Sequence, residues 1–86
     1  MIQMSRTNVE VIVPALGKRY EFVIPSAMKV GIAAGLITRA IREYEGLAGN
    51  EDSILLLGSK GRKDMLENNV SIERAGVRDG SELILI

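Results

Sequence analysis

Few residues of this chain could do chemistry, because two of the most versatile side chains are absent. The sequence contains no histidine and no cysteine. Without histidine it lacks the commonest general base and the commonest metal ligand. Without cysteine it can form no disulfide, thiolate metal site or thiol nucleophile. A catalyst would need a carboxylate pair or an activated lysine, and no such constellation is visible. The sequence predicts a non-enzymatic protein with no cofactor and no metal.

The remaining polar clusters are better explained as turns. Lys60, Arg62 and Lys63 could contact phosphate or an acidic partner. Asp64 adjoins them and no aromatic residues interleave, so a solvated hairpin turn is the better interpretation. The segment 58–61, Gly-Ser-Lys-Gly, lacks the glycine spacing and the following helix of a phosphate-binding loop.

Charge and composition limit the kinds of partner. Eleven basic residues balance eleven acidic ones, which argues against a broad surface for nucleic acid. No apolar stretch approaches the ~18 residues that span a membrane, so no membrane insertion is expected. We expect a flexible lead-in at residues 1–8 and one domain at residues 9–86. Because residues 1–8 also lack the apolar core of a signal peptide, the expected location is a reducing cytoplasm.

Hydrophobic periodicity predicts the elements that must carry any site. Residues 9–13 and 20–24 alternate with a period of two, which predicts two strands of a hairpin. From residue 29 to 45 the period becomes helical, and Gly46 suits a left-handed C-cap. The predicted core face of this helix carries Val30, Ala33, Ala34, Ile37, Ala40, Ile41 and Tyr44. The glycines at 31 and 35 on the helix are expected to mark a close contact with a neighbouring segment.

The second half of the chain predicts three more strands. Short apolar runs at 53–57 and 65–66 indicate strands, and Asp79-Gly80 is a turn that leads into the last strand. The order β-β-α-β-β-β predicts an α+β fold in which one helix packs on one face of a mixed sheet.

Two segments resemble a known family. Residues 66–85, Leu-Glu-Asn-Asn-Val through Leu-Ile-Leu, resemble the last third of a ubiquitin-like domain, and residues 20–25 are similar to its second strand. The best match in that superfamily is the bacterial YukD/EsaB family. The resemblance implies a β-grasp fold and an accessory or regulatory role in a type VII secretion system. Those proteins have no C-terminal Gly-Gly tail, and the present chain ends in Ile86, so we expect no conjugation.

The sheet face that the helix leaves open is the predicted partner-binding site. Residues expected to face the helix are Val9, Val11, Val13, Tyr20, Phe22, Ile24, Ile54, Leu56, Leu83 and Leu85. Alternation then sends the other aliphatic residues outward, namely Ile12, Val23, Leu55, Leu57, Ile84 and Ile86. If the last strand lies between the first and third, Ile12, Ile84 and Leu55 form a contiguous patch, and such patches mark interfaces. By resemblance, the recognition patch of ubiquitin lies on this face, with Leu55 and Ile84 at corresponding places.

Other interpretations stay open at this point. The outward aliphatic residues could be ordinary strand formers that their neighbours partly cover. The open face could join two copies in a structural homodimer. A sulfur-carrier-like β-grasp protein that has lost its tail is a further alternative. For the binding module we expect Ile84→Asp or Leu55→Asp to abolish partner binding while the fold survives. On the helix, Ile32 and Leu36 lie off the core stripe and could form a second, smaller contact.

Overall fold

The computed structural model describes residues 5–47, 55–59 and 62–86, and for 55–59 and 62–64 it describes the backbone alone. Five strands and one helix follow the predicted order. They are β1 (Arg6–Val13), β2 (Lys18–Pro25), α1 (Val30–Glu45), β3 (Leu55–Ser59), β4 (Arg62–Met65) and β5 (Ser81–Leu85).

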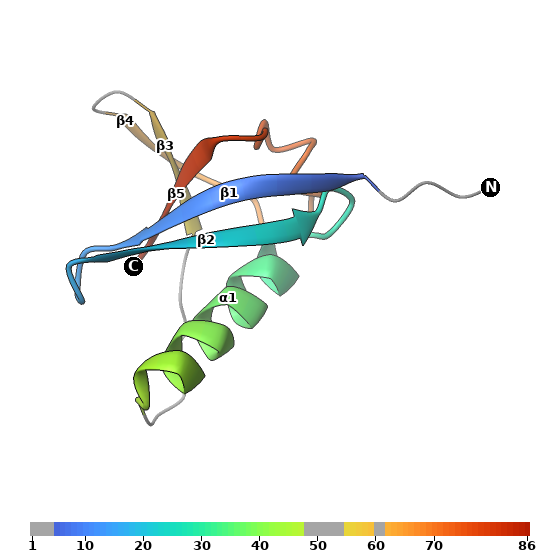
Figure 1. The fold of residues 1–86 in the computed structure, drawn as a ribbon. Helices are drawn as coiled ribbons and strands as arrows, with labels where there is room; N and C mark the ends of the chain where they lie inside the picture. The colour runs from blue at the N-terminus through green and yellow to red at the C-terminus, as the bar shows by residue number, and fades with distance from the viewer. Residues whose placement is uncertain (1–4, 48–54, 60–61) are drawn as a thin grey trace.

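The strands form one mixed sheet with the order β2-β1-β5-β3-β4. β1 and β5 run parallel, whereas the other neighbouring pairs are antiparallel. The last strand therefore lies between the first and the third, as the sequence predicted. α1 crosses one side of this sheet (Figure 1). Among the described residues it is the only helix, so the opposite side has no helical cover.

Alternate strand residues build the core between sheet and helix. Val9, Val11 and Val13 of β1 are buried, and Leu83 of β5 is fully buried beside Val11. This confirms the inward residues predicted for these strands. Tyr20 and Phe22 of β2 are partly buried against the same core. Helix and connecting segments complete it with Val30, Ala33, Ala34, Ile37, Ile41, Leu66, Ile72 and Val77.

The helix ends where the sequence predicted, but its core face is shorter. Gly46 caps α1 in the left-handed conformation, with φ of 69°. Ala40 and Tyr44 were expected to face the core, yet both are exposed, and Tyr44 keeps 81% of its surface. A groove of about 650 Å³ lies between β2 and the C-terminal half of α1, lined by Tyr20, Phe22 and Tyr44 among others. Figure 1 shows this end of α1 farther from the strands than its first turn.

The connection between β4 and β5 packs on the first turn of α1. The Val30 N–H donates to the Val70 carbonyl at 2.8 Å, and the Gly31 N–H donates to the Asn68 carbonyl at 3.1 Å. These bonds satisfy helix donors that Lys29 does not cap with its side chain. A Cβ on Gly31 would lie 3.1 Å from Asn68 Cβ, which confirms the predicted close contact. Gly35 makes no such contact with any described residue.

Several predicted boundaries differ from the structure. β1 begins at Arg6, so residues 6–8 belong to the sheet and not to a flexible lead-in. The reason is a buried hydrogen bond of 2.6 Å between the Thr7 and Ser26 hydroxyls, which fixes the start of the strand. β3 reaches Ser59, beyond the predicted end at residue 57, and β4 spans Arg62–Met65, so Arg62 and Lys63 lie in a strand and not in the predicted turn before residues 65–66. Ile54, predicted to face the helix, lies outside the described residues.

Candidate functional site

The side of the sheet opposite α1, here called the outer face, is the candidate site. Residues directly opposite each other on neighbouring strands point to the same side of a sheet. On β1, Asn8, Glu10 and Ile12 alternate with the buried valines and so lie on the outer face. Their register partners extend this assignment across the sheet.

A row of register partners crosses the outer face at the level of Ile12. Ile12 is paired with Arg19 of β2 on one side and with Ile84 of β5 on the other. Beyond Ile84, the pairing continues to Leu56 of β3 and then to Met65 of β4. This confirms the predicted proximity of Ile12 and Ile84. We refer to the Ile12–Ile84 pair as the aliphatic row.

The predicted place of Leu55 and Leu57 on the outer face is wrong by one residue. The register pairs Leu55 with Leu85 and Leu57 with Leu83, and both partners are core residues. Leu56 is therefore the register partner of Ile84. A slip of one residue exchanges the two faces of a strand, and an unbroken run of aliphatic residues carries no alternation that would fix the register. The side chains of Leu55 and Leu57 lie outside the described part of the chain.

Exposure on the outer face is also distributed differently from the prediction. Ile84, the expected centre of an exposed patch, keeps only 9% of its surface, although it does not belong to the core cluster beneath the sheet. Ile12 is half-buried. The exposed apolar side chains lie farther out, with Val23 at 59% and Met65 at 73%, and Ile86 also exposed. The side chains of the aliphatic row are thus largely covered, and exposed apolar side chains lie around them.

Three glutamates separate Val23 from the aliphatic row. Glu10 is paired with Glu21 of β2 and with Glu82 of β5, so the three lie side by side across three strands. Val23 is paired with Asn8, one row farther from Ile12. Val23 is therefore not continuous with the aliphatic row. The sequence analysis did not single out this glutamate row, which only the pairing of three distant segments assembles.

The glutamate row borders a hollow in the outer face. Arg19 donates to Glu10 at 3.0 Å, and both side chains are substantially exposed. A depression of about 520 Å³ lies over β1 and β2 and is lined by Asn8, Val9, Glu10, Glu21, Phe22, Val23 and Gly80. The outer face can therefore receive a side chain that combines apolar and positively charged parts.

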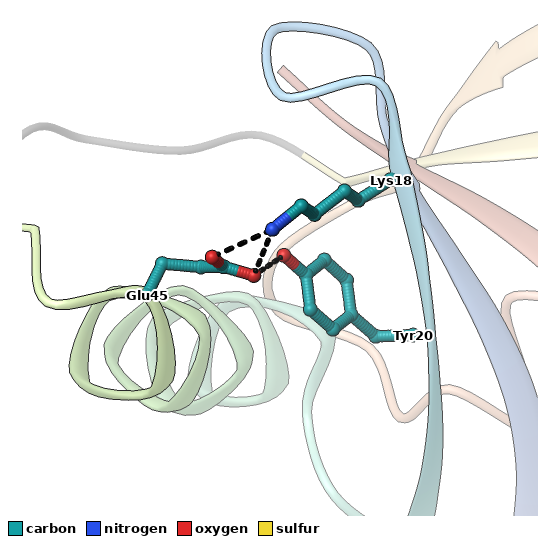
Figure 2. A network of polar contacts seen from close by, with 3 residues as sticks. All are labelled: Lys18, Tyr20 and Glu45. Atoms are coloured by element: carbon teal, nitrogen blue, oxygen red, sulfur yellow. Dashed lines mark hydrogen bonds and ion pairs between the residues drawn. The ribbon is translucent and has the colours of Figure 1, made fainter.

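A second polar cluster joins β2 to the last turn of α1 (Figure 2). Glu45 accepts hydrogen bonds from Lys18 Nζ, at 3.0 Å and 2.8 Å to its two oxygens, and from the Tyr20 hydroxyl at 2.5 Å. The bond to Glu45 raises the pKa of Tyr20 to about 12. The hydrogen bond from Lys18 and, to a smaller extent, the one from Tyr20 lower the pKa of Glu45. Tyr44 packs edge-on against Tyr20, with ring centres 6.3 Å apart. These contacts join the last turn of α1 to the start of β2.

Apolar side chains are also exposed along α1. Ile32, Leu36 and Tyr44 are spaced by four or eight residues and keep about half or more of their surface. Leu36 lines a small hollow of about 200 Å³ beside β2, together with Phe22 and Val23. Ile32 does not line this hollow, so it offers an exposed apolar control position on α1.

Neither a metal-binding cluster nor a membrane-spanning helix occurs in the described part of the chain. Within residues 5–47, 55–59 and 62–86, no group of three or more acidic side chains could hold a metal ion. The single helix of that part of the chain is neither long enough nor apolar enough to cross a membrane.

Comparison with known proteins identifies the fold through structure alone. No family model and no curated protein matches the sequence. The C-terminal ubiquitin-like domain of mouse tubulin-specific chaperone e superposes with a TM-score of 0.74 at 20% identity, covering 99% of this chain and 89% of that one. The protein has a ubiquitin-like β-grasp fold. This confirms the α+β fold class and the β-grasp topology that the sequence predicted.

Two other structural neighbours of this protein are ubiquitin-like domains of EccD proteins, and one of these is a type VII secretion system protein. One is the ubiquitin-like domain of the Mycobacterium tuberculosis type VII secretion system protein ECCD1, with a TM-score of 0.70, 21% identity and coverage of 96% and 99%. The other is the EccD5 ubiquitin-like domain of Mycobacterium xenopi, with a TM-score of 0.72, 16% identity and coverage of 95% and 93%. Membership of the YukD/EsaB family stays a prediction.

Proposed function

We propose that this protein is a non-enzymatic interaction module that binds a protein partner through the outer face of its sheet. The observation that carries the proposal is the uneven cover of the sheet. α1 occupies one side, while the other carries the exposed side chains of Val23 and Met65. Exposed apolar side chains on a sheet side that no described helix covers favour a protein partner.

The proposed setting is accessory or regulatory duty in a bacterial type VII secretion system, on the cytoplasmic side. Support comes from the EccD domains among the structural neighbours and from the resemblance to the YukD/EsaB family. The absence of histidine and cysteine from the whole sequence supports a binding role over a catalytic one.

Affinity capture from cells that carry the native gene tests both parts. Val23→Asp and Ile86→Asp place a charge on the outer face at exposed positions, so they spare the fold and should lose the partner. Ile32→Asp is the matched control, because Ile32 is exposed on α1 and lies outside the hollow that Val23 lines, so this variant should retain the partner. Mass spectrometry should identify a type VII secretion component in the captured complex. Loss of that component with Ile32→Asp alone would refute the outer-face assignment.

Secretion itself provides a second readout. Deleting the gene should lower the export of type VII substrates, and the wild-type gene should restore it. The Val23→Asp and Ile86→Asp genes should fail to restore export while their products accumulate normally. Restoration by both variants would argue against this role. Light scattering of the purified protein should give a monomer, whereas a dimer that Val23→Asp dissociates would favour the homodimer.

A further inference from the structure

The glutamate row is an arrangement that folding alone does not favour. Glu10 lies directly opposite both Glu21 and Glu82, and like charges directly opposite each other destabilise a sheet. Only Glu10 of the three forms an ion pair with a described side chain, at 3.0 Å to Arg19. Glu21 and Glu82 are exposed on the same face. An opposite charge supplied from outside would relieve this repulsion.

The surroundings of the row are suited to more than a bare charge. Glu10 and Glu21 line the depression of about 520 Å³ together with Val23, which is exposed. On the other side of Glu10 along β1 lies Ile12, half-buried beside Ile84. Lysine and arginine side chains have apolar stems and charged ends, so their stems could cover Val23 or Ile12 while their ends reach the carboxylates.

We propose that the outer face recognises a basic, apolar segment of a partner protein, with lysine or arginine side chains on the row of Glu10, Glu21 and Glu82. The inference rests on the proposed function and specifies its partner. In an extended segment, side chains two residues apart point to the same side, and successive rows on the outer face are also two residues apart. Apolar side chains two residues from the basic ones would therefore cover the aliphatic row. Charge complementarity of this kind sets partner choice and association rate.

Binding of a defined peptide tests the proposal directly. The probe is a synthetic peptide of about eight residues in which arginine and leucine alternate at every second position with serine between them, so that both face the same side, and its control carries glutamate in place of arginine. Titration into the ¹⁵N-labelled protein should shift the amide signals of Glu10, Ile12 and Glu82. Binding should weaken as sodium chloride rises from ~50 to ~500 mM, because salt screens exposed charges. The glutamate peptide should cause no shifts there.

Two triple variants separate the site from general acidity. Glu10→Gln/Glu21→Gln/Glu82→Gln should weaken peptide binding by about tenfold or more. The matched control, Glu43→Gln/Glu67→Gln/Glu73→Gln, removes the same charge from exposed positions outside the sheet and should stay within about twofold of wild type. Thermal unfolding of both variants confirms that they fold. Equal affinities of the two variants, shifts confined to α1, or no binding to wild type would overturn the inference.

The two proposals fail in different ways. If the natural partner is lost with Val23→Asp but retained by the triple variant of the glutamate row, the outer face binds and its partner is not basic. If the natural partner survives Val23→Asp and Ile86→Asp, the proposed function itself is refuted.

Discussion

Ile84 lies directly opposite Ile12 in the parallel pair of β1 and β5, and the two differ in exposure. Ile12 is half-buried, whereas Ile84 keeps only 9% of its surface. β5 is central in the sheet, so strands flank Ile84 on both sides, through Ile12 and Leu56. The residue that the sequence placed at the centre of an exposed patch therefore contributes mainly to stability.

Truncating Ile84 should destabilise the fold. Ile84→Ala removes buried methyl groups and should lower the free energy of unfolding by about 2–4 kcal/mol. Val23→Ala, at an exposed position on the same face, should lower it by less than about 1 kcal/mol. Urea denaturation followed by circular dichroism measures both. If both variants lowered the free energy of unfolding by a similar, small amount, the result would contradict the burial of Ile84. The same burial means that Ile84→Asp should unfold the protein, contrary to the sequence-based expectation.

The ionisation of Tyr20 should report its bond to Glu45. Tyr44→Phe leaves Tyr20 as the one tyrosine of the chain, so ultraviolet absorbance follows it alone. We expect a pKa of about 12 for Tyr20, and adding Glu45→Gln should bring that pKa down toward 10. The raised pKa means that the stabilisation is complete below pH 10 and is lost as pH rises toward 12. Far-UV circular dichroism separates ionisation from unfolding. A pKa near 10 in the folded protein would contradict the hydrogen bond.

Glu45 should make stability depend on acid pH. Its pKa is lowered by the bonds from Lys18 and Tyr20, so the folded state favours the carboxylate. The stabilisation is present above the unfolded-state pKa, near 4.5, and is lost as pH falls through the lower folded-state pKa. Wild type should melt at a higher Tm than Glu45→Gln at pH 7, and the gap should close in stronger acid. A gap that stays constant with pH would show that the carboxylate charge contributes nothing.

The two helix glycines should respond differently to alanine. Gly35 is exposed with no described contact, so Gly35→Ala should raise the free energy of unfolding by up to about 1 kcal/mol. In Gly31→Ala the new Cβ would meet Asn68 at 3.1 Å and the Asn68 carbonyl at 3.3 Å, which should cancel or reverse that gain. Chemical denaturation of the two variants gives the comparison. Equal stabilisation would show that the β4–β5 connection yields freely to the added methyl group.

Local pattern was sufficient to predict the elements of this chain. The period of two in β1 and β2, the helical period after Lys29 and the C-cap at Gly46 are properties of neighbouring residues, and the structure has them. These patterns also identified the inward valines of β1 and the outward Val23. The order of elements then led to the β-grasp topology, because a single apolar helix stripe requires one sheet face to cover it.

Tertiary structure alone decided what the outer face presents. In β3, aliphatic residues occupy successive positions, so only the pairing with β5 placed Leu56, and not Leu55, beside Ile84. Likewise, Glu10, Glu21 and Glu82 come from three segments, and their row exists only because β1 pairs with both β2 and β5. Periodicity along a chain determines which residues of a strand share a side. Their neighbours on that side depend on register, which long-range pairing sets.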